Sequence, residues 1–163
     1  LRLKVNETKS AVASVFTDRK FLGYSFWLSQ GQVKRAVAFK AQATFRQRVR
    51  QLTRRSGGRS LQQVVDRLRS YMLGWKGYFR LSQTPGVWRT LDEWIRHRLR
   101  AIQLKQWRRS ATIYRELRAL GAPQWVAQKV AGNSRCWWRN SAKALNGVLT
   151  LAYFDRLGLP RLS

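Results

Sequence analysis

Residues 60–80, SLQQVVDRLRSYMLGWKGYFR, contain the pattern that decides the fold. Ser60, followed by Gln63 three residues later, is typical of a capping box that opens a helix. Apolar side chains then recur at intervals of three and four residues, as they do on one side of an α-helix. They are Leu61, Val64, Val65, Leu68, Met72, Trp75 and Phe79. The stretch therefore predicts one amphipathic helix that packs its apolar stripe into a core.

Basic residues of this stretch share a flank of the predicted helix. At about 100° per residue, they fall together roughly a quarter turn from the apolar stripe. This first row is Arg69, Lys76 and Arg80. The next predicted helix begins after Thr84-Pro85-Gly86 and carries a second row at the same spacing, Arg89, Arg96 and Arg100.

Two antiparallel helices packed through their apolar stripes would bring the two rows together. Their axes would lie roughly 10 Å apart, and the rows would line one basic groove. The alternative is that each row is merely solvated.

The charge of the whole chain has the same sign. Among 163 residues, 33 are Lys or Arg and 7 are Asp or Glu, giving a net charge of +26. The hydrophobic content of 44% is enough to fill a core, so the charge is not a sign of wholesale disorder. Phosphate backbones are the commonest reason for such a bias, and nucleic acid is the predicted partner. A general preference for Arg accounts for part of the excess.

The composition disfavours a membrane role and any structure held by disulfides or zinc. The apolar residues come in short groups interrupted by charge, and none approaches the ~18 consecutive apolar residues of a spanning helix. No membrane role is therefore expected. Cys136 and His97 are the only residues of their types, which excludes an internal disulfide and an ordinary Cys/His zinc site. This composition fits a reducing cytoplasm, and Leu1 at the start suggests the end of a longer protein.

The fold class predicted is mainly α, with a small antiparallel β unit at the N-terminus. Strands are expected at residues 11–16, 20–28 and 33–37, with turns at 17–19 and 30–32. Short connections between three helices predict a three-helix bundle over residues 38–108. Its first helix, up to about residue 54, is very basic and includes Arg46 and Arg50. Residues 109–163 are predicted to form a short helical C-terminal region.

The residues offer little for catalysis. Transfer chemistry with two metal ions needs converging carboxylates, and the seven here are scattered. Only Asp92 and Glu93 are close, and adjacent helical residues point about 100° apart. We expect this pair to favour the first helical turn through the dipole instead. Gly57-Gly58 lacks the Lys-Ser/Thr that follows in a phosphate-binding loop.

A tryptophan pair stands out near the C-terminus. Trp137 and Trp138 lie between Arg135 and Arg139 in a predicted loop. Aromatic side chains flanked by cations can stack on bases. Local packing explains the pair equally well, and both interpretations stay open.

The order of these motifs resembles a known family. Leu68, Gly74-Trp75 and Tyr78-Phe79 resemble the core of the group II intron maturase-specific domain. Residues 91–100 and Lys105-Gln106-Trp107 fit the second helix pattern of that domain. Upstream, residues 6–10 and 21–26 resemble the last two sequence blocks of group II intron reverse transcriptases. The resemblance spans essentially the whole chain.

The resemblance implies a role for each part. Residues 1–37 would be the end of a reverse transcriptase palm, with Lys9 near the phosphates of the incoming nucleotide. Phe21, Leu22, Gly23 and Tyr24 would form a primer grip. Residues 38–108 would be the thumb or maturase domain, and residues 109–163 a basic extension without a DNA-binding and endonuclease part.

The metal-binding Tyr-x-Asp-Asp motif of the palm is absent from this chain. Polymerase activity therefore does not carry over, and no catalytic residue or cofactor is assigned. Mg²⁺ would belong to the absent palm and to the intron RNA.

The function expected is that of an RNA-binding maturase segment that assists intron folding, splicing and retromobility. Its partners would be group II intron RNA, an RNA template–DNA primer duplex and an upstream reverse transcriptase half. Two alternatives remain: a truncated or split thumb of an RNA-directed DNA polymerase, and a generic basic DNA-binding module. The residues expected to contact nucleic acid are Arg46, Arg50, Arg69, Lys76, Arg80, Arg89, Arg96, Arg100, Arg135, Trp137, Trp138 and Arg139.

Overall fold

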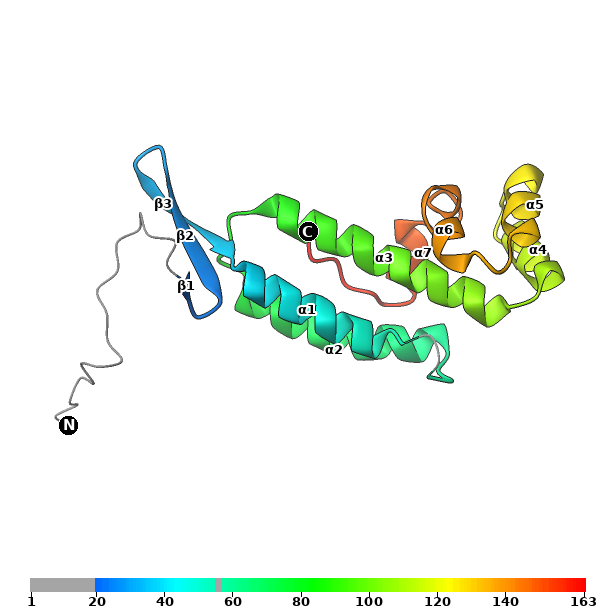
Figure 1. The fold of residues 1–163 in the computed structure, drawn as a ribbon, viewed down its shortest axis with the longest axis horizontal. Coiled ribbons are helices and arrows are strands. Elements are labelled where there is room, and N and C mark those ends of the chain that lie inside the picture. Colours follow the sequence, from blue (N-terminus) through cyan, green and yellow to red (C-terminus); the bar gives the residue numbers. More distant parts are fainter. Residues whose placement is uncertain (1–19, 55–56) are drawn as a thin grey trace.

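The computed structural model describes residues 20–54 and 57–163. In this part of the chain, a three-stranded antiparallel sheet precedes a series of helices (Figure 1). The sheet consists of β1 (Lys20–Phe21), β2 (Tyr24–Ser29) and β3 (Gln32–Val37), in that order. The fold class predicted from the sequence is confirmed. The predicted strand at residues 11–16, the turn at 17–19 and Lys9 lie outside the described residues.

Two tight turns join the three strands. Leu22 and Gly23 both have positive φ, 49° and 81°, and so do Gln30 and Gly31, with 52° and 73°. Positive φ at both central residues suits a two-residue hairpin turn, because its twist matches that of the strands. The second turn was predicted. The prediction of one continuous strand over residues 20–28 is wrong, because the chain reverses at Leu22-Gly23 and Phe21 pairs with Tyr24.

The first hairpin turn is attached to the end of the second helix, α2 (Leu61–Tyr78). The Tyr24 hydroxyl donates to the Tyr78 carbonyl at 2.7 Å, and the Tyr78 hydroxyl donates to the Leu22 carbonyl at 2.9 Å. A Cβ atom at Gly23 would come within 3.1 Å of the Phe79 ring. Only glycine allows this close approach without displacing the ring.

Three helices form the predicted bundle: α1 (Phe39–Leu52), α2 and α3 (Pro85–Trp107). The capping box at Ser60 and Gln63 is present, and Pro85 occupies the first turn of α3. Phe45 of α1 packs against Trp75 of α2, with ring centroids 4.2 Å apart. Trp75 in turn meets Trp88 of α3 edge-on at 5.1 Å. The apolar stripes predicted from the sequence therefore face one another across the bundle.

The remaining helices lie along and beyond the end of α3 (Figure 1). They are α4 (Ser110–Ala119), α5 (Gln124–Gly132), α6 (Trp137–Asn140), the short 3-10 helix η1 (Lys143–Leu145) and α7 (Leu151–Arg156). Trp137 and Trp138 begin α6, so the loop predicted there is wrong. One hydrophobic core runs from Val37 to Leu162. The predicted division at residues 37/38 and 108/109 stays a prediction. Within the described ranges, no helix is both long enough and apolar enough to span a membrane.

Candidate nucleic-acid interface

The first basic row begins on α2, with Arg69 and Lys76. The prediction that the helix extends to Arg80 is wrong, because α2 ends at Tyr78 and Arg80 lies in the turn that follows. Arg69 and Arg80 are exposed and Lys76 is half-buried. The Lys76 ammonium group donates to the main-chain carbonyl of Arg161 at 2.9 Å. This row therefore presents charge at the surface, and its central member also holds the C-terminal segment (residues 157–163).

The second row has a different environment on α3. Arg89 is exposed, but Arg96 is 3% exposed and Arg100 is 8% exposed. The Arg96 guanidinium lies 3.2 Å from the Asp92 carboxylate, one helical turn earlier. Arg100 donates through Nε to the Leu149 carbonyl at 2.9 Å. Burial, and to a lesser degree the charge of Arg96, lowers the pKa of Arg100. The alternative that this row is merely solvated is therefore wrong for Arg96 and Arg100, and the contact of the row with nucleic acid stays a prediction.

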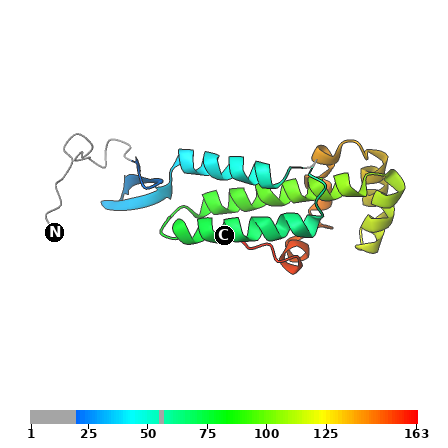
Figure 2. The ribbon, with the colours of Figure 1, turned by 90° about the horizontal axis from the view of Figure 1, so that it is seen from below.

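The C-terminal segment explains this difference. It runs beside α2 and α3 on the side away from α1 (Figure 2). Asp92 accepts hydrogen bonds from the main-chain N–H groups of Leu162 and Ser163 and from the Ser163 hydroxyl, at 2.8–3.1 Å. Gln62 of α2 donates to the Leu157 carbonyl at 3.1 Å. Both helices therefore contact the chain's own C-terminal segment, α2 through Lys76 and α3 through Asp92, and the shared basic groove stays a prediction.

Asp92 and Glu93 are separated by the same packing. Asp92 is buried and binds both Arg96 and the C-terminal segment, whereas Glu93 is exposed. We expected this pair to favour the first turn of the helix through the dipole. That expectation is wrong, because α3 begins at Pro85 and has no acidic residue in its first turn. Asp92 acts instead through specific hydrogen bonds and an ion pair.

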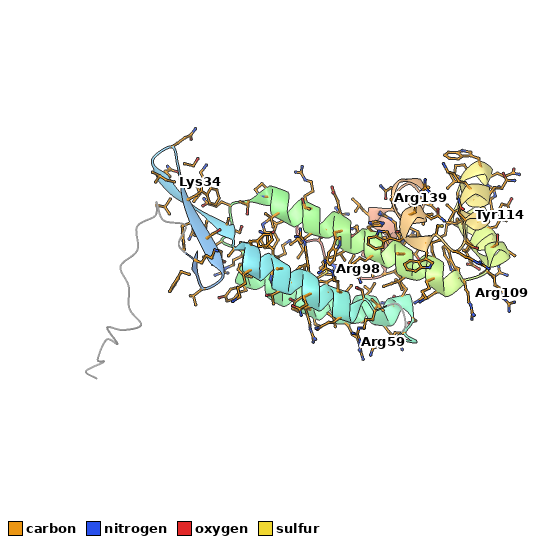
Figure 3. All side chains as sticks on the ribbon, in the orientation of Figure 1. Lys34, Arg59, Arg98, Arg109, Tyr114 and Arg139 are labelled. Atoms are coloured by element: carbon orange, nitrogen blue, oxygen red, sulfur yellow. The ribbon has the colours of Figure 1, made fainter. Side chains whose placement is uncertain are left out.

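A second basic surface lies between α1 and α3. Arg50 of α1 and Arg98 of α3 both place their guanidinium carbons over the Trp94 ring, at 5.7 and 5.4 Å from its centroid. Arg98 also donates through Nε to the Thr53 hydroxyl at 2.8 Å (Figure 3). Sequence reasoning did not select Arg98, although Trp94 four residues earlier is a signal for such a contact. Arg46, on the same helix as Arg50, is half-buried.

The two tryptophans of α6 have separate environments. Trp137 is half-buried against the core, with the Lys105 ammonium 5.9 Å from its ring. Trp138 is 41% exposed and packs on the His97 ring, with centroids 4.0 Å apart. The flanking Arg135 and Arg139 are exposed. Both tryptophans thus take part in local packing, and whether either one stacks on a base stays a prediction.

The predicted primer-grip residues lie at the first hairpin turn. Phe21 and Leu22 are 66% and 65% exposed, whereas Gly23 and Tyr24 are held against the end of α2. Their role in gripping a primer stays a prediction. Among the described residues, no group of three or more His, Cys, Asp or Glu side chains could hold a metal ion.

Fold and charge together define the class of protein: strongly basic and mainly helical, with a small sheet at its N-terminal side. Residues 42–121 match the family model of the group II intron maturase-specific domain. This segment, from within α1 to just past α4, is therefore similar to a maturase-specific domain. The match supports the resemblance drawn from the sequence for these residues, and the palm and thumb roles stay predictions. No curated protein matches the chain.

Proposed function

We propose that this chain is the RNA-binding maturase segment of a group II intron-encoded protein. The observation that carries the proposal is the match of residues 42–121 to the maturase-specific domain. In this role it assists the folding and splicing of the intron RNA and its retromobility. Its partner is group II intron RNA, encountered in a reducing compartment such as the cytoplasm.

The exposed cations suit this role. Arg69 on α2, Arg80 just past the end of α2, Arg50 on α1 and Arg89 on α3 are all open to a polyanion. Arginine and lysine side chains neutralise phosphates and release counterions, which gives affinity without reading sequence. Recognition of a folded RNA then depends on its shape. The protein supplies positive charge at fixed positions, and the RNA supplies the splicing chemistry.

A second candidate is a thumb segment of an RNA-directed DNA polymerase. The exposed apolar side chains of the hairpin, Phe21 and Leu22, favour it, because an upstream reverse transcriptase half would cover them. The nucleic acid would then be a template–primer duplex. We assign no nucleotide incorporation to this chain by itself, since holding two metal ions needs converging carboxylates. Template-dependent extension by the purified chain, abolished by a point mutation within it, would contradict that assignment.

Filter binding tests the proposal against a generic DNA-binding module. We expect tighter binding to a structured group II intron RNA than to duplex DNA of the same length. With about six to ten phosphate contacts, affinity should fall by roughly 10³–10⁵ between 50 and 200 mM salt. Equal affinity for both nucleic acids would favour the DNA-binding module, and a flat salt response would contradict the electrostatic mechanism.

A further inference from the structure

A cavity of about 790 Å³ lies between α3 and the C-terminal part of the chain. Arg89, Arg96 and Arg100 line it from α3, and Ser141, Asn146 and Arg161 line it from the other side. Cavities that hold small ligands or cofactors have volumes of ~300–1,000 Å³. This cavity is therefore large enough for a nucleotide.

Arg96 has unused hydrogen-bonding capacity at this cavity. Its Nη1 atom pairs with Asp92, but the buried Nε and Nη2 atoms have no hydrogen-bond partner. A buried donor without a partner costs about 1–3 kcal/mol, and more when the group is charged. The Nε and Nη2 donors lie on one edge of the guanidinium plane, which is an arrangement that binds two oxygens of a carboxylate or phosphate at once. The unpaired Nε and Nη2 donors of Arg96 are therefore suited to bind an anionic acceptor.

The charge around the cavity has the same implication. Four guanidinium groups line it, those of Arg89, Arg96, Arg100 and Arg161, against the carboxylates of Asp92 and Glu93. Because Arg161 is paired with Asp155, the excess of positive side-chain charge at the cavity is one. Asp92 is already saturated by Arg96 and by the Leu162 and Ser163 donors. The lowered pKa of Arg100 has the proximity of Arg96 as its second cause, which reflects the closeness of these positive charges. A phosphate oxyanion would balance the excess.

We propose that this cavity binds a phosphate group carried by a nucleotide. The Nε–Nη2 edge of Arg96, which is buried and unpaired in the structure, turns to the phosphate when it binds, and Arg89 contacts the phosphate at the cavity rim. The identification of the nucleotide as a unit of bound RNA rests on the proposed function, whereas a free nucleotide would present the same phosphate chemistry. The C-terminal segment shapes the site, because Asp92 fixes both that segment and the other end of the Arg96 guanidinium.

The Nε–Hε resonance of Arg96 tests the proposal directly. The full chain, with labelled arginine, is titrated with inorganic phosphate, with adenosine 5′-monophosphate and with uncharged adenosine, at constant ionic strength set by chloride. We expect a saturable shift of this resonance with the first two probes and none with adenosine. The Arg96→Lys variant, whose spectrum lacks the resonance, provides its assignment. A linear, non-saturating response to both phosphate probes would overturn the proposal.

Three variants separate this site from general attraction to a basic protein. Arg96→Lys keeps the charge but loses the two-oxygen edge, so its phosphate affinity should fall about tenfold or more. Arg89→Gln, at an exposed position, should lower it about two- to fivefold and leaves the core intact. Arg109→Gln removes the same charge from an exposed residue at the far end of α3 and should change nothing (Figure 3). Equal losses for Arg89→Gln and Arg109→Gln would contradict a specific site, even if Arg96→Lys does not fold.

Binding of intron RNA to the same labelled chain identifies the source of the phosphate. An Arg96 shift on RNA binding assigns the phosphate to RNA, and a shift with the mononucleotide but not with bound RNA assigns it to a free nucleotide. If RNA binds while neither phosphate probe nor RNA shifts Arg96, the cavity proposal fails and the proposed function stands. If the phosphate probes shift Arg96 but no RNA binds, the proposed function fails and the site stands.

Discussion

The two basic rows have the same spacing along their helices and opposite environments. In the first row, Arg69 on α2 and Arg80 just past its end are exposed, and Lys76 reaches the C-terminal segment with its ammonium group. On α3, Arg96 and Arg100 are buried beneath chain segments that follow them by about 50 residues or more, as the bond from Arg100 to Leu149 shows. Spacing fixes which face of a helix a residue occupies. It does not fix whether another part of the chain covers that face.

The largest expected loss of stability comes from removing the Asp92 carboxylate, which pairs with Arg96 of the second row. Asp92→Ala leaves the buried Arg96 charge uncompensated and removes the anchor of the C-terminal segment. Breaking one side of a buried ion pair costs about 3–5 kcal/mol of unfolding free energy. Urea denaturation measures this loss. Glu93→Ala, at the exposed neighbouring position, is the control and should change stability by about 0.5 kcal/mol or less. Equal losses of stability in the two variants would mean that packing does not distinguish the two carboxylates.

Truncation of Trp75, on the apolar stripe of α2, should give the next largest loss of stability. Trp75 contacts Phe45, Phe79 and Trp88, with ring centroids 4.2–5.1 Å apart. Trp75→Ala should therefore cost about 3 kcal/mol, at the lower end for such truncations because the side chain is half-buried. Thermal or chemical unfolding checks the value. Trp125→Ala, at a largely exposed position on α5, should be nearly neutral, and a similar loss there would show that Trp75 has no special place in the core.

Charge reversal at one position of each row tests whether the exposed row affects RNA binding and the buried row affects stability. Arg80→Glu on the exposed row should weaken RNA binding several-fold and lower the slope of log affinity against log salt by about one, without a change in unfolding temperature. Arg96→Glu on the buried row should instead destabilise the fold, because it places two carboxylates together at Asp92. Filter binding and thermal unfolding of the two variants distinguish these outcomes. If Arg96→Glu folds normally, the burial described for the second row is wrong.

The smallest effect concerns pH. The hydrogen bond from Arg161 lowers the pKa of Asp155, and both side chains are substantially exposed. Because the pKa is lowered in the folded state, the contribution of this pair is fully present above about pH 4 and is lost as the pH falls through the lowered pKa. It should be small, because the pair is screened by solvent. Denaturation of wild-type, Asp155→Asn, Arg161→Gln and the double variant at pH 3 and pH 6 measures the pair, and a coupling larger at pH 3 than at pH 6 would contradict the sign.

Much of the helical region could be predicted because its determinants are local. Ser60 and Gln63 fix the start of α2, Pro85 fixes the start of α3, and the stripe from Leu61 to Phe79 faces the core. The break at Leu22-Gly23 was missed, because the flanking β-branched and aromatic residues favour a strand on either side of a two-residue turn. Helix α6 was missed because its four residues are too few to show the periodic spacing of apolar residues that indicates a helix.

The sequence by itself determined the resemblance to the maturase-specific domain, the sign of the charge, the principal helices and the face of each helix that carries cations, since these depend on residue type and on spacing within one element. Only the tertiary structure decided which cations remain at the surface. Asp92 and Leu162 are 70 positions apart, and their hydrogen bond forms because the C-terminal segment packs against both α2 and α3. No sequence pattern within α3 or within the C-terminal segment specifies that contact. Burial of Arg96 and Arg100 follows from it, as does the cavity beside them, because burial depends on all the chain that surrounds a side chain.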